Sequence, residues 1–304
     1  MARLNLFVLL LLTLIFTPAR AEILVLVHGY LGSADSWEQS GINDILDANG
    51  WKRGGLLTAS PRAAQFLVGP GKDAEKRVYV VDLPSQATIG VQTDNFIRML
   101  ETIRQTSRPG EPIIIVGHSA GGVVARMALV LGGAENVKAL ITIASPHVGT
   151  TLASEALDAT DESGMFGPIK SFFGGNGYQT LRHSRGLLFD LEYPHPGSLL
   201  YWLNAQPHPD IKYVSVIRIN PAGFAGDELV PGYSQDMNNV PSIRGKSSVF
   251  TTPTGHLLIP QDADTILWIL DSIDQDEDKQ KDTSEDKPSA TAVVPRFTWR
   301  SSQS

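Results

Sequence analysis

The stretch "IIIVGHSAGGVVARMALVL", residues 113–131, limits the folds open to this chain more than any other segment. An apolar, β-branched run leads into a serine flanked by glycines, and an amphipathic apolar run follows it. The first run is typical of a buried strand and the second of a helix. The pattern predicts a sharp strand–turn–helix unit with Ser119 at the turn, where Gly117 and Gly121 relieve crowding.

The rest of the chain repeats this alternation of strand and helix. Runs at 22–29, 77–84, 112–119, 138–145, 212–219 and 247–252 predict strands, most of them apolar on both faces. Helices are expected at 93–105, with Thr93 as its cap, and at 120–133 and 262–273. These elements predict an α/β fold, a doubly wound and mostly parallel sheet with helices on both faces.

Two regions interrupt the alternation. Residues 151–210 are rich in Gly, Pro and aromatic side chains and lack a clear strand, which favours a lid or a substrate wall; extra packing is the alternative. The candidates for substrate binding in this segment are Phe166, Phe172 and Phe173. Residues 274–304 begin with an acidic run and predict a disordered tail.

The first 21 residues have the layout of a secretory signal peptide. A basic Arg3, an apolar run and the small-x-small site ending at Ala21 come in that order. The apolar run is shorter than the roughly 20 residues of a membrane span, so a cleaved signal is favoured over an uncleaved anchor. The sequence therefore predicts a secreted or periplasmic protein with a catalytic domain over 22–273.

Composition narrows the expected partners. A net charge of -7 provides no basic surface for nucleic acid, and the absence of cysteine excludes disulfides. No metal or cofactor motif is recognised, so neither is expected.

A serine at such a turn is either part of a plain tight turn or a nucleophile. The strand and helix on either side favour the nucleophile, because "GHSAG" then fits the G-x-S-x-G elbow. A serine hydroxyl needs a base, and the base needs an orienting acid. In elbow-type folds the order along the chain is serine, acid, histidine, and His256 is the histidine that follows the last predicted strand.

The acid is less strictly fixed by the order. Asp227, Glu228 and Asp236 all lie between the strand at 212–219 and His256. Asp227 is favoured because it comes first after a glycine-bearing loop, and Glu228 is the second choice.

Ester cleavage also needs backbone N–H groups for the oxyanion. Ala120 follows the nucleophile and would provide one donor, and Tyr30, in the "HGYLG" loop after the first strand, would provide the other. His28 in the same loop is expected to be structural.

With these motifs in hand, the chain resembles the α/β-hydrolase superfamily and, more closely, secreted bacterial triacylglycerol lipases and esterases. The resemblance is carried by "LVHGYLGSADSW", "GHSAGG", "ASPHVGT", "GDELVP" and the "GH" at 255–256. It implies a minimal sheet of about six strands, Ser119, Asp227 and His256 as a triad, and Tyr30 and Ala120 as oxyanion donors. The chain departs from some larger secreted lipases in lacking a cysteine pair and a recognisable calcium loop.

The expected function is that of a secreted serine carboxylic ester hydrolase that forms an acyl-enzyme on Ser119 and acts on lipid or other acyl esters. Contact with a lipid surface would then be transient, through the substrate. An acyltransferase or a serine peptidase would use the same triad. A non-catalytic binding protein on this fold is a further alternative, since a fold alone does not prove a function.

Overall fold

The computed structural model describes residues 21–60, 64–161 and 177–285. The candidate signal peptide, except Ala21, and Phe166, Phe172 and Phe173 lie outside these ranges. Contacts divide the chain into two units, Met1–Ala263 and Asp264–Ser304, which are considered separately.

A mixed sheet of eight strands forms the centre of the first unit, in the order β3-β2-β4-β1-β5-β6-β7-β8. All neighbouring pairs are parallel except β2 with β3, which is antiparallel. The α/β fold with a mostly parallel sheet is therefore confirmed. The strands are β1 Glu22–Val27, β2 Lys52–Thr58, β3 Gln65–Val68, β4 Lys76–Asp82, β5 Ile113–His118, β6 Val137–Ile143, β7 Lys212–Arg218 and β8 Ser247–Thr252.

The expected strand count of about six is wrong, because β2 and β3 extend one edge of the sheet. Both lack the signal of a buried strand: β2 carries Gly54 and Gly55, and β3 is short and mostly exposed. Gly55 leaves room for the Phe66 ring, since a Cβ on Gly55 would lie 2.4 Å from a ring carbon of Phe66. Glycine is unfavourable in a strand by propensity, so tertiary packing decides this edge.

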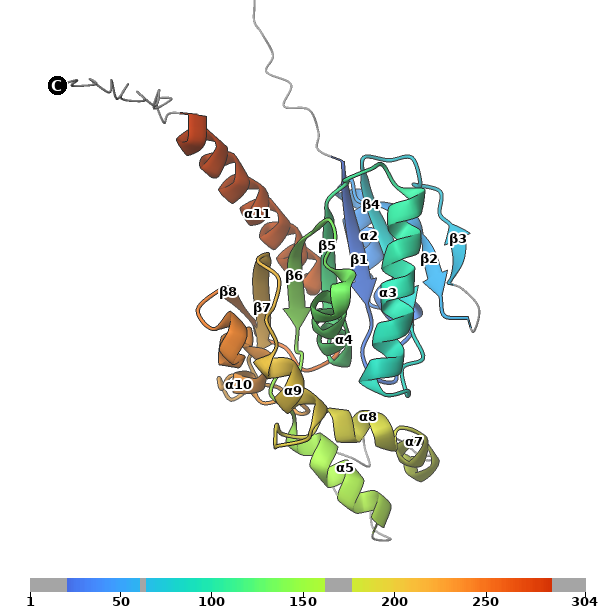
Figure 1. Cartoon of the computed structure of the whole chain (residues 1–304), viewed down its shortest axis with the longest axis vertical. Helices are drawn as coiled ribbons and strands as arrows, with labels where there is room; N and C mark the ends of the chain where they lie inside the picture. Colours follow the sequence, from blue (N-terminus) through green and yellow to red (C-terminus); the bar gives the residue numbers. More distant parts are fainter. Residues whose placement is uncertain (1–20, 61–63, 162–176, 286–304) are drawn as a thin grey trace, which may run out of the picture. The chain divides into compact units, whose positions relative to one another are not determined.

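Helices cover the sheet as the alternation predicted. In Figure 1, α3 (Ile89–Thr106) and α4 (Ala120–Ala128) cross the near face, and α2 (Ile42–Ala48) lies behind the sheet. The short α1 (Asp35–Gln39) precedes α2. The segment η1 (Leu129–Gly133) follows α4, and its backbone leaves the helical conformation at Leu131 and Gly132. The main core lies between α3, α4 and one face of the central strands.

The start of α3 differs from the expectation. Its cap is Thr88, whose hydroxyl accepts the Val91 amide at 3.3 Å, whereas Thr93 is buried within the helix. The helix begins one turn earlier because Ile89 adds to the stripe formed by Phe96, Leu100 and Ile103.

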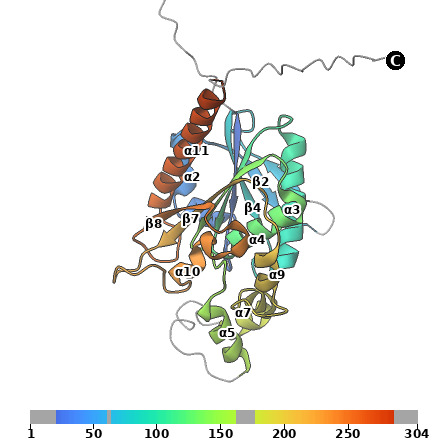
Figure 2. The same ribbon diagram turned by 60° about the vertical axis from the view of Figure 1, so that its left-hand side comes forward.

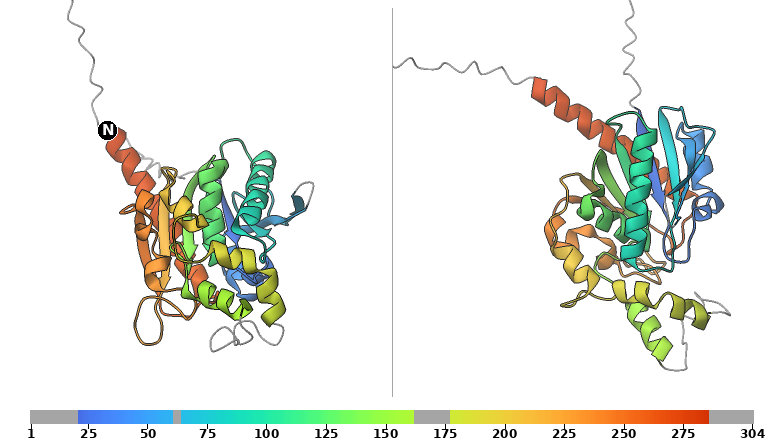
Figure 3. Two further views of the ribbon diagram at one scale, coloured as in Figure 1. Left: turned by 60° about the horizontal axis from the view of Figure 1, so that its bottom comes forward. Right: turned by 45° about the vertical axis from the view of Figure 1, so that its right-hand side comes forward.

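The 151–210 segment is helical where it is described. It contains α5 (Thr151–Asp161), α7 (Gly177–His183), α8 (Arg185–Asp190) and α9 (Leu199–Ala205). These helices gather at the end of the sheet where the parallel strands finish (Figures 1 and 2). Both views of Figure 3 show α5 beside α7 and α8 at that end. The short helices α10 (Gly232–Gln235), η3 (Met237–Asn239) and η4 (Pro241–Ile243) lie between β7 and β8 in the chain.

β1 lies at a switch point of the sheet. β1 pairs with β4 on one side and β5 on the other. The chain leaves β1 toward α1 and α2 but leaves β5 toward α4, so the two connections run to opposite faces. In open α/β sheets, ligands bind at such a switch point.

The last helix, α11 (Gln261–Glu285), is longer than the expected 262–273. It continues through twelve positions, 274–285, that were expected to belong to a disordered tail, so that part of the expectation is wrong. Residues 286–304 lie outside the described ranges. Within the described ranges, none of the helices has the length and apolar character needed to cross a membrane.

Candidate active site

Ser119 stands at a strained turn between β5 and α4. Its backbone has φ 52° and ψ −130°, a conformation that L-residues rarely adopt. Its amide donates to the Ile143 carbonyl at 2.8 Å, and its carbonyl accepts the Gly122 amide at 3.0 Å. Two neighbouring positions must be glycine because a side chain there would overlap the adjacent backbone. A Cβ on Gly117 would lie 2.5 Å from the Gly122 Cα, and a Cβ on Gly121 would lie 2.3 Å from the His28 carbonyl oxygen.

A continuous chain of hydrogen bonds links three side chains from three loops. The distance from Ser119 Oγ to His256 Nε2 is 2.9 Å, and that from His256 Nδ1 to Asp227 Oδ2 is 3.0 Å. Ser119 follows β5, Asp227 follows β7 and His256 follows β8. The parallel sheet brings together the ends of these strands, and with them Ser119, His256 and the acid that the sequence analysis favoured, Asp227.

The Asp227 carboxylate is held on both oxygens. Oδ1 accepts the amides of Leu229 and Val230, each at 2.8 Å, and Oδ2 also accepts the Gln235 side-chain amide at 3.0 Å. Burial acts to raise the pKa of Asp227, but the hydrogen bond and charge of His256 and the two backbone amides outweigh it, so the pKa is lowered. Gln235 was missed by sequence reasoning, and only the fold of α10 brings it to this carboxylate.

The other two acid candidates have different contacts. Both oxygens of Glu228 accept the His256 backbone amide, at 3.2 and 3.3 Å. Asp236 caps η3 by accepting the Asn238 amide at 2.8 Å. Neither is hydrogen-bonded to the His256 imidazole, which is paired with Asp227.

His118 is hydrogen-bonded to the backbone carbonyl of His256, whereas Glu228 is hydrogen-bonded to its backbone amide. The His118 Nε2 donates to the His256 carbonyl at 2.8 Å, and the two rings lie with centroids 5.2 Å apart. Burial, helped by the charge of His256, lowers the pKa of His118 to about 3. Together with Glu228, this bond fixes the backbone of His256 on both sides.

The loop after β1 lies directly against the nucleophile. A Cβ on Gly29 would lie 2.7 Å from Ser119 Cβ, so the chain can pass here only as glycine. Tyr30 follows in this loop, and Ala120 is the first residue of α4, where an amide has no acceptor within the helix. These are the positions where two oxyanion donors were expected. His28 packs inward and accepts the Leu83 amide at 2.9 Å, in keeping with a structural role.

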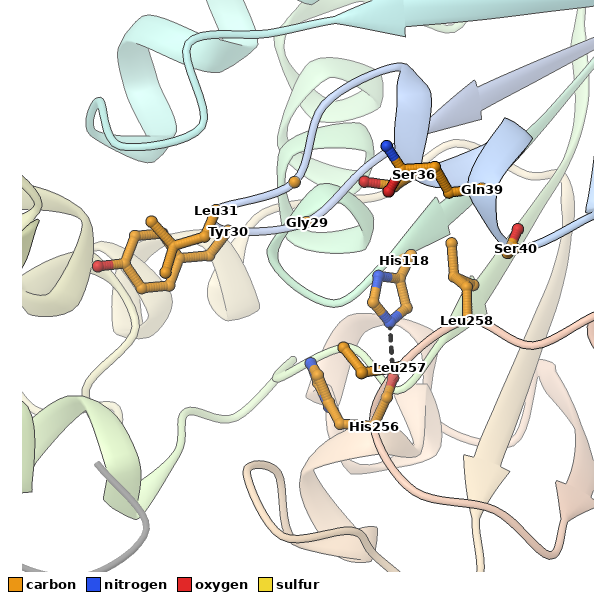
Figure 4. Close-up of a pocket in the computed structure, with 11 residues that line it drawn as sticks. Gly29, Tyr30, Leu31, Ser36, Gln39, Ser40, His118, His256, Leu257 and Leu258 are labelled. Carbon is orange, nitrogen blue, oxygen red and sulfur yellow. Dashed lines mark hydrogen bonds between the residues drawn. The ribbon is translucent and has the colours of Figure 1, made fainter. Parts of the chain in front are cut away.

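Two cavities meet at Tyr30 and His256. The larger, about 340 Å³, lies between the loop after β1 and the segment that follows His256 (Figure 4). The smaller, about 40 Å³, includes Ser119 and is mostly aliphatic. Its apolar lining comes from Leu152, Ala153, Leu188, Leu191, Leu229 and Val230.

The 151–210 segment therefore supplies part of the wall next to Ser119 through Leu152, Leu188 and Leu191. The same segment also packs inward, since Leu181, Leu200 and Leu203 are fully buried. The 151–210 segment therefore both lines the cavity beside Ser119 and packs into the core. The three phenylalanines proposed for substrate binding lie outside the described residues, and their assignment stays a prediction.

Over the ranges that the structure describes, no group of three or more His, Cys, Asp or Glu side chains is arranged to hold a metal ion. The chemistry that this site can perform with its own side chains is nucleophilic attack by a hydroxyl, with general acid–base assistance.

Comparisons with known proteins agree with this architecture. Several solved structures share the fold at low sequence identity. The product of gene lin2722 from Listeria innocua matches with a TM-score of 0.56 and 16% identity, over 83% of this chain and 94% of that one. Mature Bacillus licheniformis lipase BlEst2 matches with a TM-score of 0.54 and 18% identity, over 83% and 91%. The putative cell surface hydrolase from Lactobacillus plantarum WCFS1 matches with a TM-score of 0.53 and 14% identity, over 87% and 98%.

No curated protein sequence matches the chain. The family model described as "PGAP1-like alpha/beta domain" matches residues 22–275, which is most of the sequence. The chain therefore belongs to the PGAP1-like alpha/beta domain family.

Proposed function

We propose that the protein is a serine carboxylic ester hydrolase of the lipase and esterase type. The observation that carries this proposal is the unbroken series of hydrogen bonds from Ser119 through His256 to Asp227. It lies at the switch point of a hydrolase fold, beside a partly aliphatic cavity.

The geometry supports a two-step reaction. Ser119 Oγ attacks the acyl carbon while its proton passes to His256 Nε2, and the carbonyl oxygen becomes an oxyanion that the amides of Tyr30 and Ala120 stabilise. The bond from carbon to the alcohol oxygen then breaks, and His256 returns the proton to that oxygen. An acyl group remains on Ser119.

Water completes the cycle. It attacks the acyl carbon, gives a proton to His256 Nε2, and the bond to Ser119 Oγ breaks as the proton returns to the serine. Asp227 keeps the imidazole in the tautomer with a proton on Nδ1 throughout, since this carboxylate stays ionised.

The small aliphatic cavity favours an apolar acyl group, in agreement with an acyl ester or lipid substrate. The 1–21 segment, with its signal-peptide layout, supports export to the periplasm or medium. An acyltransferase or a peptidase would use the same residues, and a binding protein would need none of them.

The decisive experiment measures hydrolysis of p-nitrophenyl esters from acetate to palmitate by the wild type, Ser119→Ala and Ser107→Ala. Ser107 ends α3 and precedes β5, so it serves as the matched control. We expect Ser119→Ala to lose roughly 10³-fold or more in kcat, and Ser107→Ala to keep its activity.

Mass spectrometry after treatment with a fluorophosphonate should find the adduct on Ser119. A wild type that neither hydrolyses any ester nor reacts with the probe would refute the proposal. Faster turnover of a peptide, or faster transfer to an added alcohol than to water, would replace it with a peptidase or a transferase.

A further inference from the structure

The larger cavity has a mixed lining, mostly apolar, with several polar groups that the proposed reaction does not yet use. Its volume of about 340 Å³ is roughly ten times the share of one liquid water molecule. Figure 4 shows Ser36, Gln39 and Ser40 along one side, with His118, Leu257 and Leu258 opposite. His256, whose Nε2 is hydrogen-bonded to Ser119, also borders the cavity.

The tautomer of His118 is fixed by its partner. A carbonyl oxygen can only accept, so the 2.8 Å contact with His256 requires a proton on His118 Nε2. Burial holds the pKa of His118 near 3, so the ring is neutral at ordinary pH and Nδ1 carries a lone pair. In Figure 4 this Nδ1 edge points away from the His256 carbonyl, on the side of Gly29. Among the described residues, no hydrogen bond involves this nitrogen.

The opposite side offers groups that can complement it. Ser36 Oγ accepts the Ser33 amide at 3.1 Å, which leaves its hydroxyl proton available. The Gln39 side chain is exposed and can both donate and accept. Ser40 Oγ already donates to the Trp37 carbonyl at 3.1 Å, so it contributes only as an acceptor. The cavity therefore combines an acceptor on a nearly buried residue, His118 Nδ1, with the polar side chains of Ser36, Gln39 and Ser40.

An ester consists of an acyl part and an alcohol part, which differ in polarity, and the linings of the two cavities differ in polarity as well. The smaller, more apolar cavity suits the carbons of an acyl group, whereas the larger cavity adds polar groups on Ser36, Gln39 and His118 that suit an alcohol with hydroxyls. His256 borders both cavities, as it must if it returns its proton to the alcohol oxygen.

We propose that the larger cavity is the subsite for the leaving alcohol and that it selects an alcohol carrying a further free hydroxyl group, which donates to His118 Nδ1. This inference rests on the ester hydrolase function proposed above and adds the substrate class of its alcohol half. An alkyl alcohol of the same length would displace water from the cavity and leave the nitrogen without a donor. Such a loss costs about a factor of ten in binding the transition state.

The test compares two butyrate esters that share the acyl group and a three-carbon alcohol, n-propyl butyrate and 2,3-dihydroxypropyl butyrate. Each kcat/KM is divided by the alkaline hydrolysis rate of the same ester, which removes the intrinsic difference in leaving-group reactivity. We expect the corrected ratio to favour the dihydroxypropyl ester by roughly tenfold or more in the wild type. In His118→Gln, whose side-chain amide can still donate to the His256 carbonyl but which lacks Nδ1, the ratio should fall toward one, and a ratio that stays at the wild-type value would overturn the inference. Gln39→Leu keeps His118 Nδ1 and should lower the ratio by less.

Gln105→Leu is the matched control. Gln105 lies in the last turn of α3 and donates to Glu101, and we expect the wild-type ratio there. A wild-type ratio near one, with hydrolysis of both esters abolished by Ser119→Ala, would reject the subsite and keep the proposed function. A change in acyl-length preference in Gln39→Leu, with an unchanged alcohol ratio, would assign the cavity to the acyl chain and overturn the inference. If Ser119→Ala still hydrolyses the esters, or if the wild type hydrolyses neither ester, the proposed function and the subsite are both rejected.

Discussion

At the scale of single residues, His256 is restrained more closely than a surface loop residue needs to be. Its amide donates to Glu228, its carbonyl accepts from His118, and its ring lies between Asp227 and Ser119. A base must present its nitrogen within hydrogen-bond distance of the nucleophile, so fixing the backbone limits the positions that the ring can take. Glu228 and His118 are therefore positioning residues in the proposed reaction.

This division of roles makes the two neighbouring carboxylates separable. Asp227→Asn should lower kcat by roughly 10³- to 10⁴-fold, because an amide cannot hold the imidazole in the required tautomer or balance its charge. Glu228→Gln should lower kcat by less than about tenfold, because its amide oxygen can still accept the His256 amide. Steady-state kinetics on one p-nitrophenyl ester compares the two variants. Equal losses, or a larger loss for Glu228→Gln, would contradict the assignment of Asp227.

At the scale of elements, a buried ion pair fixes the segment that follows His256. Arg218, at the end of β7, donates to both oxygens of Asp262, at 2.6 and 2.9 Å, and to the Leu257 carbonyl at 3.3 Å. Asp262 also accepts the Ile259 amide at 3.0 Å. Both side chains are essentially unexposed. The pair therefore ties the strand end to the 257–262 segment.

Removing one partner should therefore be costly. Asp262→Ala leaves the Arg218 charge buried without its carboxylate and should destabilise the fold by about 3–5 kcal/mol. The double variant Arg218→Met with Asp262→Ala should recover part of this loss, since no uncompensated charge remains. Urea unfolding followed by circular dichroism measures both. A double variant less stable than Asp262→Ala alone would refute this account.

The elements also show where sequence patterns mislead. The strands that are apolar on both faces were predicted within a residue or two, because burial on both sides demands that composition. β2 and β3 were missed because they form an edge, where glycines fit against Phe66 and Tyr79 and no apolar run is needed. The early start of α3 at Thr88 and the length of α11 were missed because caps and helix ends depend on the surrounding chain.

At the scale of the whole molecule, buried neutral histidines tie stability to pH. Burial lowers the pKa of His28, His118 and His147 below the ordinary value of 6.5. Below pH 6.5 the unfolded chain binds protons that the folded chain does not, so the free energy of unfolding must fall as the pH drops. A histidine that is neutral in the folded chain and protonated in the unfolded chain contributes at most about 1.4 kcal/mol per pH unit.

We therefore expect a lower urea midpoint at pH 5 than at pH 7. His147→Gln should reduce the difference between the two, because one proton-binding group is removed from the unfolded state. The His147 Nε2 is hydrogen-bonded to Thr142 Oγ1 at 3.0 Å and takes no part in the hydrogen bonds that join Ser119, His256 and Asp227. The effect of His147→Gln on the pH dependence of stability is therefore separable from catalysis. A midpoint that is equal or higher at pH 5 would contradict the prediction.

The sequence by itself determined the alternating α/β architecture, the turn at Ser119 and the order of serine, acid and histidine, because each depends on local composition or on chain order. Only the tertiary structure shows which of Asp227, Glu228 and Asp236 is hydrogen-bonded to the His256 imidazole, since all three lie in the correct interval and differ in which atoms they reach. It also brought Gln235 to the carboxylate and turned His118 toward the His256 carbonyl. Such contacts join residues far apart in the chain, and their distances are set by the packing of the whole sheet rather than by any local pattern.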